Sequence, residues 1–236
     1  MDISRKLEME RLHIEQKELF DSHVLNLLNG QFMYEEFKEN NIMGESDSAP
    51  FNEAMCVNAT TERIFEQDFI RTRASGHHET EETYIKKVIE PLQNLIDKHR
   101  YESIVLWFGE DMFCQMNLLT ILAYLEQSGY EGKVILSSFR EDEFRTSQTE
   151  IRLGHYLDVY KEVLVMHTRP SYELLPVMYQ AIEIYLDMLN EDNAVTRYIA
   201  KNKELIESEL LHQLFELFPA VGYGDTQYAE LIHKVK

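Results

Sequence analysis

The chain has few cysteines and no long apolar run. Its two cysteines, Cys56 and Cys114, are far apart and show no CxxC spacing, so they form neither a disulfide framework nor a zinc-binding pattern. No window approaches the roughly 18 consecutive apolar residues of a membrane span. The first residues, MDISRKLEMERLHIEQ, lack the apolar stretch of a signal peptide. We therefore expect a cytoplasmic protein with no membrane segment, in which both cysteines are core residues.

Basic residues are also scarce. The 236 residues include 23 Lys and Arg against 42 Asp and Glu, which gives a formal net charge of −19. Phosphate backbones and anionic membranes attract positive charge, so this balance argues against nucleic-acid and membrane partners. A helical hairpin over 208–235 is the best candidate DNA-binding element, but its exposed positions are acidic and it lacks a basic recognition helix.

Several motifs of common active sites are absent from the sequence. It contains no GxGxxG or GxxxxGK[ST] phosphate cradle, no GxSxG nucleophile turn and no HExxH zinc motif. His77-His78-Glu79, with Glu81 and Glu82 close behind, has metal-ligand residue types but no third ligand at a suitable spacing. We expect a solvated helix start there and no metal site. The cofactor, if there is one, stays unknown.

The strongest structural signal is ESIVLWFGEDMFCQMNLLTILAYLEQ, residues 102–127. ESIVLWFG reads as a strand, DMFCQMNLLTILAYLEQ as a helix, SGYEG as a turn and KVILSS as a second strand. This succession has the length of one βαβ unit. Because the strands are apolar throughout rather than alternating, they are expected in a parallel sheet that is covered on both faces.

The remaining segments complete a predicted α/β fold. HVLNLLNG (23–30) is a further strand, and 41–61 is a long loop with a short strand at its start or around Ala54–Val57. Other expected helices are 4–20, QFMYEEFKEN, the segments between 62 and 100 with a break at Pro91, and 150–166, 171–190, 194–218 and 225–235. We predict a three-layer, Rossmann-like domain with a short, mainly parallel sheet over 22–146. An N-terminal helix (1–21) precedes it, and a helical C-terminal region (147–236) packs on it.

A candidate site follows from this fold, because ligands of open α/β sheets sit beyond the carboxyl ends of the strands. Four loops are expected there: Asn29-Gly30, Glu45-Ser46-Asp47, Gly109-Glu110-Asp111 and Ser137-Ser138. Asp111 and Gln115 are four residues apart and share a helix face. Either they bind a ligand, or Asp111 caps the helix and Gln115 bonds to a neighbouring loop. An acidic pair repels phosphate and suits hydroxyls, amines or hydrated Mg²⁺.

The segment VLWFGEDMFCQMNLLTILAYL resembles the uncharacterised bacterial family called domain of unknown function 1835, over about residues 22–140. Trp107, Asp111, Gln115, Leu118, Leu119 and Leu122 match its pattern. Glu53 in APFNEAMCVN and Arg71 in FIRTRAS match an acidic residue and an arginine of the family. Two segments depart from it: Asn29-Gly30-Gln31 replaces Gly-Asp-Ser, and Val57-Asn58 replaces Gly-Pro. The resemblance implies the fold and carries no activity.

Two function classes remain. The leading hypothesis is a cytoplasmic small-molecule-binding protein whose site consists of Asn29, Asp47, Glu53, Arg71, Asp111 and Gln115. Asp111 would bind a hydroxyl or amine or act as a general base, Gln115 would orient the ligand, and Arg71 would pair with a carboxylate such as Glu53. The alternative is a regulatory or protein-interaction module that acts through the helical C-terminal half, with self-contacts in a homo-oligomer. Whether the protein is an enzyme, and on what ligand, the sequence leaves open.

Overall fold

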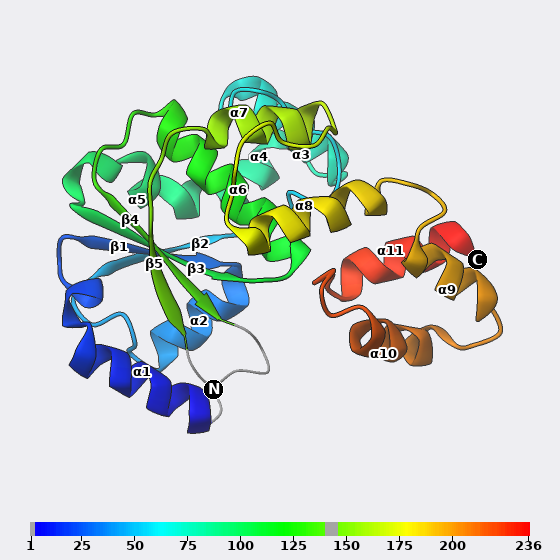
Figure 1. Cartoon of the computed structure of the whole chain (residues 1–236), viewed down its shortest axis with the longest axis horizontal. Coiled ribbons are helices and arrows are strands. Elements are labelled where there is room, and N and C mark those ends of the chain that lie inside the picture. Colours follow the sequence, from blue (N-terminus) through cyan, green and yellow to red (C-terminus); the bar gives the residue numbers. More distant parts are fainter. Residues whose placement is uncertain (1–2, 140–145) are drawn as a thin grey trace.

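A computed structural model describes residues 3–139 and 146–236 and contains a five-stranded sheet (Figure 1). The strands are β1 (Val24–Asn29), β2 (Asp47–Phe51), β3 (Ser103–Gly109), β4 (Lys133–Phe139) and β5 (Ser147–Ile151), in the order β2-β1-β3-β4-β5. The first four are parallel and β5 pairs antiparallel with β4. The predicted α/β, Rossmann-like fold with a mainly parallel sheet is thus confirmed.

Helices flank the sheet and make up most of the C-terminal part. Those before β5 are α1 (Ile3–Glu15), α2 (Gln31–Glu39), α3 (Gln67–Gly76), α4 (Glu81–Tyr84), α5 (Gln93–Ile96) and α6 (Met112–Gln127). Those after it are α7 (Tyr156–Tyr160), α8 (Pro176–Met188), α9 (Ala194–Lys201), α10 (Glu207–Leu217) and α11 (Asp225–Val235). Pro91 lies in a short 3-10 segment, Glu90–Leu92, at the predicted break. None of the helices in the described ranges is long and apolar enough to cross a membrane.

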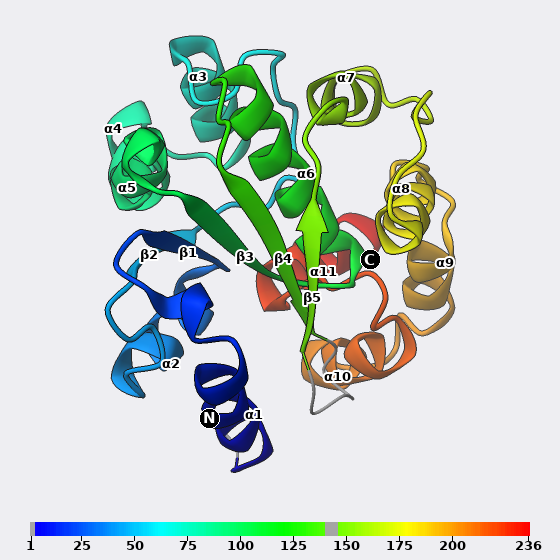
Figure 2. The same cartoon turned by 60° about the vertical axis from the view of Figure 1, so that its left-hand side comes forward.

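The two faces of the sheet have separate cores because strand side chains alternate in direction. Leu25 and Leu27 of β1 pack in the larger core with α6, α3 and α8, whereas Val24 and Leu28 point into a smaller core with α1 and α2. The two views agree that α1 and α2 lie on one side of the sheet and α3 and α6 on the other (Figures 1 and 2). The apolar runs in the sequence therefore report burial on both faces.

The smaller core contains a buried polar pair. Asn26, in the middle of β1, accepts a hydrogen bond from Trp107 Nε1 at 2.7 Å. Its own amide donates to Leu19 O at 3.0 Å and to Ser46 Oγ at 2.8 Å. Both Asn26 and Trp107 are fully buried. Since no water can replace these bonds without entering the core, the amide fixes β1, β3 and the loop before β2 relative to one another.

Three expectations about secondary structure are wrong in detail. The strand in the 41–61 segment is β2 at Asp47–Phe51, not at either predicted place. It contains Pro50, which an edge strand tolerates. The helix expected over 150–166 starts only at Tyr156, because residues up to Ile151 form the polar edge strand β5. The helix expected over 194–218 is divided into α9 and α10.

The C-terminal helices fall into two groups. α7 and α8 pack on α6, and α9, α10 and α11 pack on one another, as the orange and red ribbons show (Figure 1). The loop between α10 and α11 returns to the start of α6, where Met112 N donates to Ala220 O. This return brings the last quarter of the chain to the carboxyl edge of the sheet.

The buried Asn26 amide makes a testable contribution to stability. We expect Asn26→Leu to lower the free energy of unfolding by about 1–3 kcal/mol, because it leaves the Trp107 N–H without an acceptor in the core. Urea denaturation followed by the fluorescence of Trp107, the single tryptophan, measures the change. Asn190→Leu is the control, since the Asn190 side chain is exposed and makes one long hydrogen bond, to Leu186 O at 3.4 Å. Equal effects of the two substitutions would contradict the assignment.

Candidate functional site

The carboxyl ends of β1, β2 and β3 meet the first turns of α6. Asn117 of α6 connects them: its Nδ2 donates to Asn29 Oδ1 at 2.8 Å and to Glu53 O at 2.6 Å. Its Oδ1 accepts from Met55 N at 2.9 Å. Asn29 in turn donates to the Cys114 thiol at 2.9 Å. Polar side chains of the otherwise apolar helix α6 therefore bind the loops at this edge by hydrogen bonds.

Asp111 is the N-cap of α6. Its carboxylate accepts a hydrogen bond from Cys114 N at 2.8 Å, the usual cap interaction of an aspartate. The two preceding N–H groups have backbone partners from the C-terminal part: Met112 N donates to Ala220 O at 2.9 Å and Phe113 N to Val221 O at 3.2 Å. The cap interpretation of Asp111 is thus confirmed. An anion that needed these N–H groups would have to displace both carbonyls.

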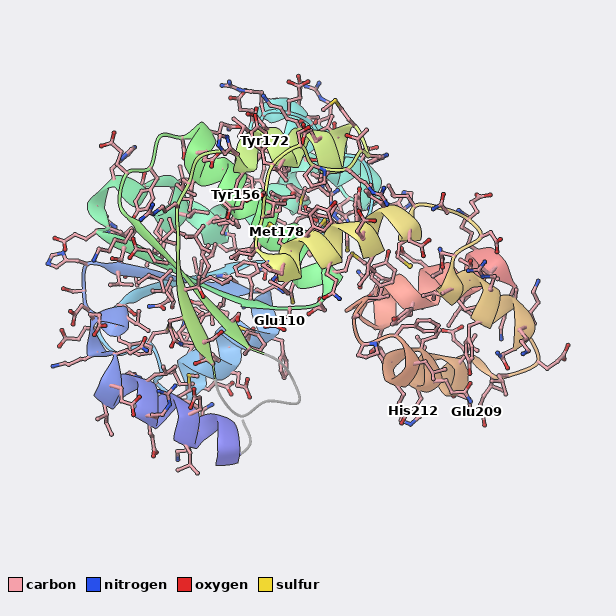
Figure 3. The ribbon with its side chains drawn as sticks, in the orientation of Figure 1. Glu110, Tyr156, Tyr172, Met178, Glu209 and His212 are labelled. Carbon is pink, nitrogen blue, oxygen red and sulfur yellow. The ribbon has the colours of Figure 1, made fainter. Side chains whose placement is uncertain are left out.

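Gly222 lies directly against the Asp111 carboxylate. Its φ is +70°, and a Cβ on this residue would be 2.0 Å from Asp111 Oδ1. Only glycine meets both requirements, the left-handed backbone and the close approach. The turn between α10 and α11 is therefore shaped to sit on the start of α6. Glu110, labelled in Figure 3, directly follows the end of β3 beside this contact.

Gln115 has an unusual environment. The side chain is fully buried, and its Nε2 donates to Gly109 O at 2.7 Å. Its Oε1 is buried and has no hydrogen-bond partner among the described residues. Leaving a buried acceptor unpaired costs about 1–3 kcal/mol, so such a group needs a physical explanation.

The most densely bonded group at this edge is Glu53. Arg73 Nη2 donates to Glu53 Oε1 at 2.7 Å and Arg73 Nε to Oε2 at 3.2 Å. His77 Nε2 and Ala54 N each lie 2.7 Å from Oε1, and the Tyr84 hydroxyl donates to Oε2. Burial alone would raise the pKa of Glu53, but the His77 hydrogen bond and the Arg73 charge hold it well below its usual range. The carboxylate is therefore ionised and already saturated with donors.

Arg73 also binds the loop that follows Glu53. Its guanidinium donates to Val57 O at 2.7 Å, Ala54 O at 2.9 Å, and Asn58 O and Ala59 O at 3.2 Å. The Arg73 side chain is fully buried. Because the fork of guanidinium donors reaches several carbonyls at once, a single side chain orders the whole 54–59 loop.

The structure brings together four of the six predicted site residues. Asn29, Glu53, Asp111 and Gln115 lie at the carboxyl edge. The first three bind residues of α6, and Gln115, itself on α6, binds the end of β3. Asp47 does not: it begins β2, at the opposite edge of the sheet. There its carboxylate accepts from Arg100 at 2.7 Å and from the Tyr101 hydroxyl at 2.6 Å. Its predicted place in a carboxyl-edge loop is wrong because the strand starts later than expected.

Arg71 is likewise outside the site. It lies exposed on α3 and pairs with Asp68 at 3.1 Å and Glu81 at 3.5 Å. The predicted Arg71–Glu53 pair is wrong, since two residues along a helix point to opposite sides and Arg73 faces inward instead. The signal for Arg73 was present in the sequence. It follows Phe69 by four residues and Ile70 by three, on the apolar face of α3.

Two tyrosines of the C-terminal half, Tyr185 of α8 and Tyr223 in the turn before α11, pack in or against the larger core. Burial raises the pKa of Tyr185 to about 12 and that of Tyr223 further. Their positions could not be read from helical spacing, because they depend on how the C-terminal segments return to the sheet.

The thiols of Cys56 and Cys114 are not activated as nucleophiles. Burial raises the pKa of Cys56 strongly, and burial together with the Asp111 charge raises that of Cys114 well above its usual range. Both cysteines are free rather than joined in a disulfide. Since the thiolate is the nucleophilic form, neither group is suited to nucleophilic catalysis near neutral pH.

Comparison of the chain with known protein families, with curated proteins and with solved structures gives no match. The resemblance to the family of domain of unknown function 1835 therefore rests on the quoted residues and stays a prediction.

The buried ion pair predicts a large difference between two neighbouring arginines. Arg73→Met should lower the free energy of unfolding by about 3–5 kcal/mol, because it leaves the Glu53 carboxylate buried without its cation. Arg71→Met removes the same charge from an exposed position and should change the stability by at most about 1 kcal/mol. Chemical denaturation of the two variants measures the difference. Similar losses of stability in both variants would contradict the assignment of Arg73 as the ion-pair partner that stabilises Glu53.

The contact of Gly222 with Asp111 can be separated from backbone strain by a matched pair. Gly222→Ala and Gly129→Ala both place a side chain at positive φ, which costs about 1–3 kcal/mol. A Cβ at Gly129 meets no atom within 4 Å, whereas one at Gly222 meets the carboxylate. We expect the larger loss of stability in Gly222→Ala, together with faster hydrogen exchange at the Met112 and Phe113 amides in that variant alone. Unchanged exchange at these amides would contradict the docking of the 220–222 turn.

Proposed function

We propose that this protein binds a small, uncharged polar molecule at the carboxyl edge of its sheet, beneath the C-terminal helices. The observation that carries the proposal is the side-chain oxygen of Gln115 on α6, which is fully buried and has no hydrogen-bond partner among the described residues. Buried polar atoms in proteins are normally hydrogen-bonded. A buried amide whose nitrogen is bonded and whose oxygen is not is therefore suited to a ligand that donates a hydrogen bond to the oxygen. The ligand must offer a hydrogen-bond donor, since the oxygen only accepts.

The charges around the edge favour an uncharged ligand. Arg73 and Glu53 neutralise each other, and the carboxylate already accepts bonds from four residues. The first N–H groups of α6, the usual anion site of an α/β protein, donate to Ala220 and Val221. The negative charge of Asp111 at the same place repels anions further. A sugar-like or amide-bearing molecule meets these conditions better than a phosphate or a carboxylate.

Tyr185 and Tyr223 add groups that suit the same ligand class. A phenol both donates and accepts a hydrogen bond, so the hydroxyls of Tyr185 and Tyr223 can bind either end of a hydroxyl or amide. They come from α8 and from the turn before α11, segments that cover this edge. A ligand held there would contact both the sheet and the C-terminal region, and closure of the turn on α6 would keep water out.

A thermal-shift screen of uncharged polar metabolites tests the proposal. A ligand at a hundredfold excess over its Kd stabilises the folded state by about 2.7 kcal/mol, which raises the Tm of a chain of this size by about 5–10 °C. We expect Gln115→Met to abolish the shift, because methionine keeps the shape and removes the acceptor. Binding of the same compound with unchanged affinity to Gln115→Met would refute the proposal, as would a screen in which only anions stabilise the protein.

Gln127→Met is the matched control. Gln127 lies at the other end of α6, and both halves of its amide are bonded, to Ile64 N and Ile64 O. This variant should start from a lower Tm and keep the full ligand-induced shift. By the same reasoning, the ligand-free Gln115→Met protein should lose less stability than Gln127→Met, since it removes an acceptor that has no partner.

A further inference from the structure

The outer surface of α8 and of the segment before it has a depression of about 460 Å³. It is lined by Tyr172, Glu173, Leu174, Pro176, Tyr179, Gln180 and Glu183. Figure 3 labels Tyr172 on the segment between α7 and α8, and Met178 on α8. This surface is separate from the Gln115 edge, so an inference about it is independent of the proposed ligand site.

Two aromatic rings shape the depression. Tyr172 stacks on His155, with ring centroids 4.2 Å apart and an angle of 7° between the planes, so it is held in place from one side. Tyr179, one turn into α8, is 42% exposed. Leu174 and Pro176 also line the depression and add apolar surface to it. An aromatic face beside apolar surface fits the stem and head of a long cationic side chain.

The charge around the rings is negative. The carboxylates of Asp158 and Glu162 raise the pKa of Tyr172, Asp158 having the largest effect. Glu173 is exposed and has no ion-pair partner within the described residues. Glu183 already binds a guanidinium, that of Arg169, through two bonds of 2.8 Å and 2.7 Å. Glu183, on the rim of the depression, is therefore placed to accept two hydrogen bonds from a guanidinium.

We infer that this depression is a docking site for a basic segment of a partner protein, which inserts an arginine or lysine side chain beside Tyr179 and Glu173. Charge complementarity selects this occupant: the rim is acidic, and a second copy of a chain with a net charge of −19 would be repelled. Arg169 binds Glu183 in the free protein and would therefore compete with the partner for that carboxylate. The depression would thus be the surface through which the C-terminal half interacts with a partner protein.

Fluorescence anisotropy with the labelled peptide Gly-Arg-Gly-Arg-Gly-Arg tests the site on the full chain, at about 0.15 M salt so that distant charges are screened. Tyr179→Ala should weaken binding by about threefold or more, as expected for a lost cation–π contact. Glu173→Gln should weaken it, whereas Glu209→Gln, the same charge change on α10 (Figure 3), should not. A peptide with serine in place of arginine should not bind.

Removal of the internal competitor gives the sharpest readout. Arg169→Ala should tighten peptide binding by about two- to fivefold, the range of a surface ion pair. Arg197→Ala removes an equal charge from α9, where Arg197 lies 3.7 Å from Asp192, and should leave the affinity unchanged. Absence of peptide binding, equal losses in Glu173→Gln and Glu209→Gln, or equal tightening in both arginine variants would overturn the inference. Circular dichroism of each variant shows that the fold is kept.

Discussion

The buried pair of Glu53 and Arg73 is the interaction on which the carboxyl edge of the sheet depends. Removing two charges from water is unfavourable, and their attraction offsets this only when every remaining donor and acceptor is bonded. The structure meets this condition, because the carboxylate also accepts from His77 and Tyr84 and the guanidinium also reaches loop carbonyls. The loop after β2 thus has a defined shape without regular secondary structure. That loop presents Met55 N to Asn117 and buries Cys56 in the larger core.

The start of α6 is the second organising element. In many α/β proteins the first N–H groups of the helix after a central strand bind an anion. Here one side chain and two carbonyls of the same chain take that place. Asp111 at this junction would repel a phosphate, but it fits here because its carboxylate accepts a hydrogen bond from Cys114 N. The local chemistry of the strand-to-helix junction therefore follows from the C-terminal region as much as from the junction itself.

Predictions from sequence succeeded where the signal was local or repeated. Continuous apolar runs identify β1, β3 and β4, and the position of Asp111 before an apolar helix identifies its cap. They failed where the outcome depends on contacts between distant segments. The choice of Arg73 over Arg71 depends on which face of α3 meets the loop after β2. The polar strand β5 forms because it pairs with the open edge of β4, and its own sequence does not predict this pairing.

The docking of residues 220 and 221 on Met112 and Phe113 has a consequence for synthesis of the chain. A ribosome adds about 5–20 residues per second, so α6 forms several seconds before its partners emerge from the exit tunnel. During this interval the carbonyls of Ala220 and Val221 are not there to accept from Met112 and Phe113. The turn at residues 220–222, which is made long after α6, thus completes the edge that β1, β2 and β3 begin.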